Sequence, residues 1–208
     1  MEAAMPLSAK TELNALLLKA GIAHDTAEAV MDIDALMQKW RRRAMKRELG
    51  NRALVDLRIG IDLAQLDVLF AIDGPSSEFD NEASGETMVA TVAERLNIDP
   101  SRASRLVGDM VDERFARRAV SQADARRTII ELTPKGKAVV DAVRAYKYLI
   151  MGDFLGSWEK AEVDAFVPLL KRFGSWMDRI EPATEKHSAE IAAIAETIAE
   201  DVTQSENV

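Results

Sequence analysis

The chain of 208 residues contains no cysteine. This absence excludes disulfide bonds, thiolate chemistry and thiol-based redox sensing, and it leaves the cellular compartment open. Histidine is also scarce, because only His24 and His187 occur and neither has a second ligand at a metal-binding spacing such as His-x3-His. We therefore expect no metal site.

Long apolar stretches are missing as well. No run reaches the roughly 18 residues that a membrane-spanning helix requires. The N-terminal sequence MEAAMPLSAK has no basic region followed by an apolar segment, which is the pattern of a secretory signal. These absences predict a protein without membrane association and with a cytoplasmic location. Hydrophobic residues still make up 48% of the chain, which is enough for a sizeable core.

The usual signatures of catalysis are absent too. No glycine-rich phosphate loop occurs, since Gly74 and Gly85 are isolated. No nucleophile is accompanied by a suitable base, and the carboxylates are scattered over polar helix faces. The sequence therefore predicts neither an enzyme nor a bound cofactor.

Positive charge is in the minority, but it is concentrated in one part of the chain. The net charge is −8, which is not typical of a protein that binds nucleic acid. Residues 101–127 nevertheless carry seven arginines and four acidic residues, whereas residues 181–208 carry seven acidic residues and one lysine. This distribution indicates one surface suited to phosphate and another kept away from it.

The N-terminal part of the chain has the periodicity of two helices. Residues 8–20 place apolar side chains on one face, and Gly21 can end this helix. Asp25 and Glu28 have the spacing of a capping box, which predicts a second helix that stops near Gly50.

A second capping box, formed by Asp62 and Gln65, predicts a helix that continues through Ile72. Residues 73–85 then have the composition of a loop, and this loop is long for a connection between two elements.

The C-terminal part is predicted to be helical. Thr133 can cap a helix whose first residue is Pro134, and this helix is expected to end near Leu155. Ser157 is expected to cap the next helix, with a kink or break near Val167 because Pro168 follows. A coiled-coil-like seam is formed by Phe166, Leu170, Phe173, Met177 and Ile180. Pro182 interrupts the pattern, and residues 183–202 predict a last helix.

Two short helices, predicted over residues 86–96 and 100–113, have the pattern of a helix-turn-helix. Asn97 lies where the chain must turn sharply, Asp99 can cap the second helix, and Pro100 fits its first position. The predicted buried face of that helix comprises Ala103, Leu106, Val107 and Met110. The opposite face presents Ser101, Arg102, Ser104 and Arg105. Short hydroxyls and arginines at the N-terminal end are what a recognition helix needs in a major groove.

Two short strands, predicted over residues 115–120 and 128–132, surround a polar turn and form a hairpin. Its charged side chains are Arg117 and Arg118 on the first strand, and Asp124, Arg126 and Arg127 at the turn. Such a hairpin can lie along DNA and place a guanidinium in the minor groove. We expect Arg126 to reach that groove and Asp124 to fix an arginine by a salt bridge, with Arg126 as the arginine that it holds.

Each of these features also has a plain structural interpretation. The helix pair could be ordinary core helices with solvated arginines, and the hairpin could be a solvated turn. Their occurrence together, in this order, favours DNA binding. The runner-up is a winged-helix module for protein–protein contact that does not bind DNA. Such a module would not need arginines on both the helix and the hairpin.

The segment from Asp62 to about Ile180 resembles the MarR family of winged helix-turn-helix transcriptional regulators. The resemblance is carried by LAQLDVL at 63–69, VAERLNIDPSRASRLVGDMV at 92–111, the Asp124-x-Arg126 wing signature, and IIELTPKG at 129–136. Two departures stand out. The family usually has glycine where this chain has Arg114, which suggests an altered start of the strand, and the loop 73–85 is longer than usual.

The resemblance implies a mainly α fold with a small β-hairpin wing, that is, a winged helix-turn-helix plus a helical dimerisation lobe. The expected division is N-terminal dimerisation helices over 1–61, a DNA-binding domain over 62–133, and C-terminal dimerisation helices with an acidic tail over 134–208. The resemblance further implies a homodimer that binds double-stranded DNA at a pseudo-palindromic operator, usually as a repressor.

Many members of that family release DNA when a small aromatic or anionic ligand binds between the two lobes. Met37, Trp40 and Phe70 are the candidate residues for such a ligand, although aromatic and methionine side chains at helical spacing are more often plain core. The basic run Arg41–Arg43 is interpreted as the solvated face of a helix rather than as an anion site.

Overall fold

The computed structural model describes residues 7–74 and 85–205, and the chain divides into two compact units. One unit comprises residues 46–157, and the other comprises residues 1–45 together with 158–208. The division into dimerisation and DNA-binding lobes that the sequence suggests stays a prediction.

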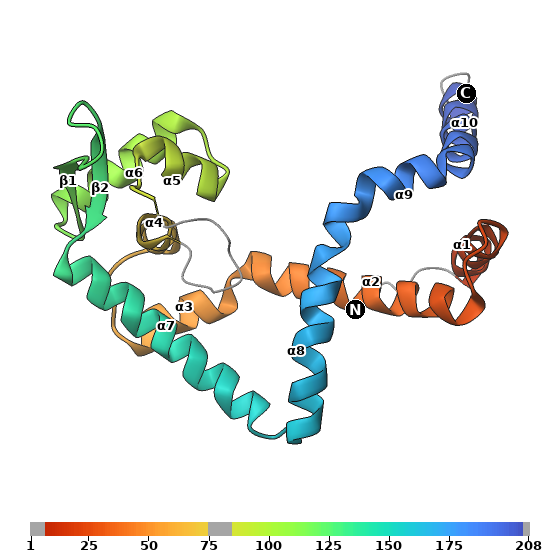
Figure 1. Cartoon of the computed structure of the whole chain (residues 1–208), viewed down its shortest axis with the longest axis horizontal. Helices are drawn as coiled ribbons and strands as arrows, with labels where there is room; N and C mark the ends of the chain where they lie inside the picture. Colours follow the sequence, from red (N-terminus) through yellow and green to blue (C-terminus); the bar gives the residue numbers. More distant parts are fainter. Residues whose placement is uncertain (1–6, 75–84, 206–208) are drawn as a thin grey trace. The chain divides into compact units, whose positions relative to one another are not determined.

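The unit formed by residues 46–157 combines helices with one hairpin. Its elements are α3 (Glu48–Asp56), α4 (Leu63–Asp73), α5 (Val89–Leu96), α6 (Pro100–Asp112), β1 (Ala116–Val120), β2 (Thr128–Leu132) and α7 (Pro134–Leu155). The strands pair antiparallel, with Ala116 opposite Leu132 and Val120 opposite Thr128. Helix α4 contacts α5, α6, α7 and β2, and Figure 1 shows it in the middle of this unit. The predicted mainly α fold with a hairpin wing is confirmed.

The core of this unit surrounds α4. The largest completely buried side chains come from four helices: Val68 and Leu69 of α4, Val92 of α5, Val107 and Met110 of α6, and Val140 of α7. Burying each side chain of this size stabilises the fold by about 1.5–3 kcal/mol. The helix pair α5–α6 is therefore packed against α4, which in turn packs against α7.

Local hydrogen bonds start two of these helices where the sequence predicts. The Asp62 carboxylate accepts the Gln65 amide at 2.7 Å, and the Gln65 side-chain oxygen accepts the Asp62 amide at 3.0 Å. The Thr133 hydroxyl oxygen accepts the Gly136 amide at 3.2 Å, with Pro134 as the first residue of α7. Both caps join residues three apart, which is why spacing alone revealed them.

The helix predicted to stop near Gly50 ends earlier. Helix α2 (His24–Lys46) stops before Arg47, whose φ of 53° is left-handed, and Gly50 lies inside α3. The Arg47 guanidinium donates to the Leu63 carbonyl oxygen at 3.0 Å and forms a salt bridge with Asp67. Because these partners belong to α4, a tertiary contact accompanies the break in the helix.

Two predicted helix caps are wrong. Asp25 lies inside the first turn of α2, which begins at His24, two residues earlier than a cap at Asp25 would imply. An acidic residue in this first turn is still favourable, because the helix dipole is positive there. Ser157 does not cap α8, since its hydroxyl donates to the Phe154 carbonyl oxygen at 2.7 Å and so completes α7.

The other unit is formed by the N- and C-terminal helices. Its elements are α1 (Leu7–Lys19), α2, α8 (Lys160–Gly174), the 3-10 segment η1 (Ser175–Arg179), α9 (Ile180–Lys186) and α10 (Ser188–Ser205). Helix α8 runs through Pro168, so the break considered near Val167 does not occur, and α-helical geometry ends at Gly174 instead. The last helix predicted from the sequence is divided at His187 between α9 and α10.

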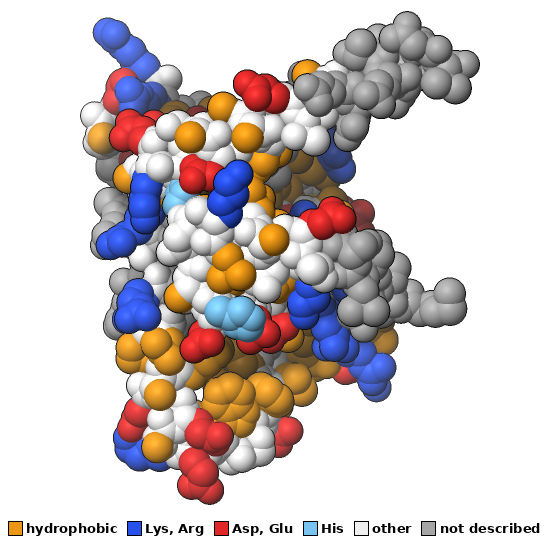
Figure 2. Space-filling view, turned by 90° about the vertical axis from the view of Figure 1, so that its right-hand side faces the viewer, with side chains coloured by type: hydrophobic (Ala, Val, Ile, Leu, Met, Phe, Trp, Pro, Cys, Tyr) orange, Lys and Arg blue, Asp and Glu red, His pale blue; other side chains and the backbone are white. Residues whose placement is uncertain are grey.

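This unit buries little of its apolar surface within one chain. Among its described residues, Ala27 is the only buried hydrophobic one. Many large apolar side chains are exposed instead, and Figure 2 shows apolar side chains on the face of the molecule where α1 and α10 lie. They include Val30, Ile33, Leu36, Met37 and Trp40 of α2, Leu169 and Leu170 of α8, and Ile191, Ile194 and Ile198 of α10.

Candidate nucleic-acid interface

Helices α5 and α6 form the predicted helix-turn-helix. Asn97 ends α5 in the left-handed conformation, with φ 50° and ψ 49°, which gives the sharp turn. The Asp99 carboxylate accepts the Arg102 amide at 2.9 Å, and Pro100 occupies the first position of α6. The inner face of α6 consists of Ala103, Val107 and Met110, which are buried, and Leu106, which is partly buried.

The outer face of α6 carries the polar side chains that the sequence assigns to DNA. Ser101, Arg102, Ser104 and Arg105 are all exposed. Neither Arg102 nor Arg105 forms a salt bridge with any part of the chain that the structure describes. Two uncompensated guanidinium groups and two hydroxyls thus gather at a helix N-terminus, where backbone amides also favour an anion.

The hairpin β1–β2 presents the other predicted arginines. Arg117 lies opposite Glu131 and pairs with it at 2.7 Å, whereas Arg118 is exposed and has no salt bridge within residues 7–74 and 85–205. At the turn, the Asp124 carboxylate accepts the backbone amide of Arg126 at 3.0 Å.

The salt bridge expected of Asp124 is made with Arg127, at 3.4 Å, and not with Arg126. Asp124 therefore shapes the backbone under Arg126 and leaves its guanidinium exposed, without a salt bridge to any described residue. The prediction that Asp124 holds the side chain of Arg126 is therefore wrong in its partner, because two adjacent arginines are within reach and Asp124 contacts Arg126 only through its backbone amide.

Arg114, which stands just before β1 where the MarR family usually has glycine, has an unusual backbone conformation. Arg114 adopts φ 63°, a left-handed conformation that glycine enters freely. The strand still begins at Ala116, and the Phe115 amide donates to the Met110 carbonyl oxygen at 2.9 Å. The chain therefore keeps this tight turn at the cost of about 1–2 kcal/mol of backbone strain.

Glu86 anchors the wing, and sequence reasoning missed this role. Its carboxylate accepts the Gln122 amide at 2.7 Å. Hydrogen bonds from the Ser121 hydroxyl and the Gln122 amide hold the pKa of the Glu86 carboxyl below its ordinary value. Because Glu86 is engaged with the hairpin, α5 begins at Val89 and not at residue 86 as predicted.

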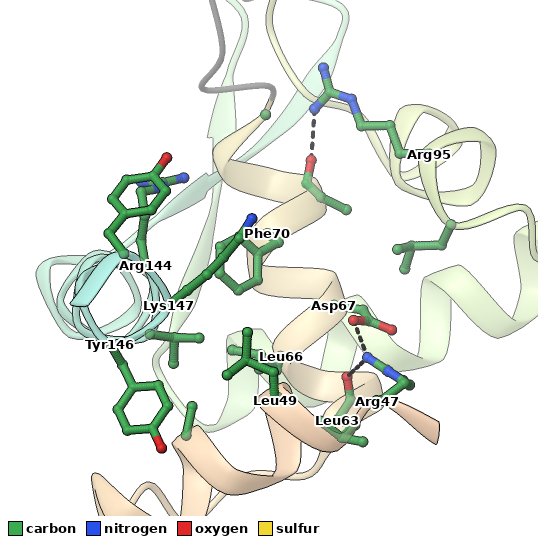
Figure 3. A pocket seen from close by; sticks show the side chains of 17 residues that line it. Arg47, Leu49, Leu63, Leu66, Asp67, Phe70, Arg95, Arg144, Tyr146 and Lys147 are labelled. Atoms are coloured by element: carbon green, nitrogen blue, oxygen red, sulfur yellow. Dashed lines mark hydrogen bonds and ion pairs between the residues drawn. The ribbon is translucent and has the colours of Figure 1, made fainter. Parts of the chain in front are cut away.

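A cavity of about 750 Å³ opens beside α4 in this unit, and Figure 3 shows its walls. The apolar and aromatic walls are provided by Leu49, Leu63, Leu66, Phe70, Leu96, Val143, Tyr146 and Tyr148. The charged side chains are Arg47, Asp67, Arg95, Arg144 and Lys147. Of the three predicted ligand residues, Phe70 lines this cavity, whereas Met37 and Trp40 belong to the other unit.

Positive charge predominates in the cavity. Arg47 is compensated by Asp67, the one acidic residue of the lining; burial raises the pKa of this carboxyl although the guanidinium opposes that effect. Arg95 donates to the Ala71 carbonyl oxygen at 2.7 Å. Lys147 pairs with no carboxylate in the described part of the chain, so its ammonium group is available to an anion.

The structure also bears on metal binding and membrane insertion. The described residues contain no group of three or more His, Asp or Glu side chains that could hold a metal ion. No helix in the described part of the chain is long and apolar enough to cross a membrane.

No model of a protein family matches the chain, and no curated protein matches it either. Solved structures do match. A MarR family protein from Bacillus stearothermophilus superposes with a TM-score of 0.58 at 18% identity, over 73% of this chain and 96% of that one. RV1404 from Mycobacterium tuberculosis gives a TM-score of 0.53 at 21% identity, over 70% and 90% of the two chains.

A further structure, described as a MarR family transcription regulator, matches with a TM-score of 0.51 at 18% identity, over 73% of this chain and 97% of that one. Similarity at such low identity is a similarity of fold. Its agreement with the observed helix-turn-helix and hairpin shows that the chain has the winged helix-turn-helix fold of the MarR family.

Proposed function

We propose that this protein is a sequence-specific, DNA-binding transcriptional regulator that acts as a homodimer, most simply as a repressor. The observation that carries the proposal is the cationic surface formed by α6 and the hairpin. Arg102, Arg105, Arg118 and Arg126 are exposed there and have no salt bridge to the described residues. The fold shared with a MarR family transcription regulator supports the same conclusion.

The two parts of this surface suit different parts of a DNA duplex. The N-terminal end of a helix such as α6 fits the major groove, where arginine and serine side chains read base edges. A hairpin fits along the backbone, from which an arginine such as Arg126 can enter the narrow minor groove. We therefore assign specificity to Arg105 and Ser104, and sequence-independent affinity to Arg126.

Dimerisation is supported by the terminal helices. Their exposed apolar side chains lack cover within one chain, and leaving apolar surface in water costs about 25 cal/mol per Å². A second copy would cover these faces and would place two recognition helices about 34 Å apart, one turn of DNA. The operator should then be pseudo-palindromic. A stable monomer in sedimentation equilibrium at micromolar concentration would contradict this part of the proposal.

Control by a small ligand is supported by the cavity beside α4. Its volume of about 750 Å³ is within the range of ligand sites. Aromatic and aliphatic walls combined with an excess of cations suit a small aromatic anion. Such a ligand can change DNA affinity only if it binds the DNA-competent and DNA-incompetent arrangements unequally.

The DNA-binding proposal is tested by a salt series. Fragments retained from genomic DNA provide the operator, and fluorescence anisotropy then compares operator with random DNA. Arg126→Ala should weaken binding to operator and to random DNA alike. The slope of the logarithm of the binding constant against the logarithm of the salt concentration should become less steep by about 0.9 for each phosphate that is no longer neutralised. Arg105→Ala should instead narrow the difference between operator and random DNA by about 1–3 kcal/mol.

The matched control is Arg52→Ala. Arg52 is an exposed arginine on α3, outside both α6 and the hairpin, and it already pairs with Asp56 at 2.8 Å. This variant should bind DNA like the wild type. If Arg126→Ala and Arg105→Ala also leave affinity unchanged at every salt concentration, this face does not bind DNA, and a protein-interaction module becomes the better explanation.

A further inference from the structure

The last turn of α4 is held by two arginines that also line the cavity. Arg95 donates from Nη1 to the Ala71 carbonyl oxygen at 2.7 Å, and Figure 3 shows this bond at the edge of the cavity. Arg144 donates from Nη2 to the Asp73 carboxylate at 2.9 Å. Each guanidinium is therefore placed between the ligand space and the end of α4.

Asp73 is the bridge between α4 and α7. Only 13% of its side chain is exposed, and it accepts hydrogen bonds from both Arg144 and Lys137, the latter at 3.0 Å. Burial raises the pKa of the Asp73 carboxyl, but the hydrogen bonds from these two cations outweigh burial and place the pKa below its ordinary value. The carboxyl is therefore ionised at neutral pH and holds both cations of α7.

The same turn of α4 supports the hairpin. The hydroxyl of Thr87, a buried residue, donates to the Ile72 carbonyl oxygen at 3.3 Å and accepts a bond from Arg95 at 3.2 Å. The Thr87 carbonyl oxygen accepts the Ile130 amide of β2 at 2.7 Å. A short chain of hydrogen bonds thus leads from the end of α4 to the wing.

We propose that Asp73 is an internal competitor for the anionic group of the ligand: a carboxylate entering the cavity takes Arg144 from Asp73 and so weakens the bridge between α7 and the last turn of α4, the turn that supports the wing. This inference rests on the proposed function and specifies how its ligand acts. Lys147, which has no carboxylate partner among the described residues, attracts the anion toward Arg144.

The exchange leaves no buried charge without a partner. Arg144 gains the ligand carboxylate in place of Asp73, and Asp73 keeps Lys137. The Phe70 ring lies 5.8 Å from the Arg144 guanidinium, so an aromatic ligand can stack beside the same group. The exchange breaks the connection between α4 and Arg144. The ligand therefore binds the arrangement without this connection more tightly than the arrangement with it, which is the unequal affinity that regulation requires.

Asp141 provides a matched control. It pairs with the same two cations, Lys137 at 3.1 Å and Arg144 at 3.4 Å, but it lies on α7 itself and is 53% exposed. Asp141→Asn and Asp73→Asn remove the same charge beside the same arginine. Only Asp73→Asn removes a connection to α4.

The test uses the full-length protein and 2-naphthoate as the probe. Calorimetry should show that Asp73→Asn binds 2-naphthoate about fivefold or more tightly than the wild type, since the probe no longer competes. DNA affinity of Asp73→Asn should be reduced and should no longer respond to the probe. Asp141→Asn should match the wild type in both measurements. Equal probe affinity in the wild type and Asp73→Asn, or no binding to any variant at millimolar probe, would overturn the inference.

A second measurement needs no substitution. The Gly74 amide donates to the Phe70 carbonyl oxygen at 3.1 Å and closes the last turn of α4. Its hydrogen exchange in the wild-type protein should accelerate when 2-naphthoate saturates the cavity, and unchanged exchange would count against the inference. Absence of salt-dependent DNA binding would refute the proposed function instead, because neither probe binding nor hydrogen exchange depends on DNA.

Discussion

Replacing Gly136 by alanine should disrupt the junction between α7 and the hairpin. A Cβ atom at this position would lie 2.1 Å from the backbone carbonyl oxygen of Phe115. Carbon–oxygen contacts in proteins lie at about 3.3–3.6 Å, so the two segments would have to separate by about 1.2 Å. The Phe115 oxygen also accepts bonds from the Thr133 amide at 3.0 Å and the Thr133 hydroxyl at 3.1 Å.

The expected loss of stability follows from these contacts. Two hydrogen bonds contribute about 1 kcal/mol each. Overpacking against a backbone atom that cannot rotate away adds about 1–3 kcal/mol. Gly136→Ala should therefore lower the free energy of unfolding by about 3–5 kcal/mol, which is a large fraction of the stability of a domain.

Urea denaturation followed by circular dichroism measures this loss. With an m-value of about 1–3 kcal/mol per M, the midpoint should fall by at least about 1 M. All variants are compared at one protein concentration, because dimerisation makes stability depend on concentration. Gly108→Ala is the control, since a Cβ on this glycine of α6 would meet nothing within 4 Å. It should be neutral or stabilising by up to about 1 kcal/mol. A Gly136→Ala protein as stable as the wild type would refute the reasoning.

Three further predictions concern stability. Arg114→Gly should relieve about 1–2 kcal/mol of strain at φ 63°, but glycine loses about 0.5–1 kcal/mol more backbone entropy on folding, so the free energy of unfolding should rise by about 0.5–1 kcal/mol, seen as a higher melting temperature. Asp99→Ala should lower it by about 1 kcal/mol through loss of the cap on α6, whereas Asp99→Ser should recover most of that. The lowered pKa of Asp73 means that its contribution is complete above the pKa of this carboxyl in the unfolded chain. That contribution should disappear as the pH falls through the lower pKa of the folded protein. The free energies of unfolding of the wild type and Asp73→Asn, measured by urea titration, should therefore converge as the pH decreases. A difference that does not change with pH would contradict this.

Features with local signals could be predicted from the sequence alone. Capping joins residues three apart, so Asp62, Asp99 and Thr133 predicted the starts of α4, α6 and α7 correctly. The helical period placed Arg102 and Arg105 on the exposed side of α6, because the apolar positions of the same helix must face the core.

Features that depend on partners distant in the chain followed from packing instead. The break at Arg47 accompanies bonds to residues of α4, and the start of α5 was displaced by the contact of Glu86 with the hairpin. The ends of the terminal helices were harder to predict. Their apolar faces are little covered within one chain, so the apolar pattern does not mark where each helix stops. Single hydrogen bonds, such as that from Ser157 to α7, decide where some of these helices end.

The cavity was the least accessible to sequence reasoning. Of its lining only Phe70 was anticipated, because the walls come from residues between positions 47 and 148 that no periodicity relates to one another. The bridge from Asp73 to Arg144 spans 71 positions in the sequence. A charge and its partner can be matched by spacing only when they share an element; when they lie on different elements, the packing of α4 against α7 decides which cation a carboxylate meets.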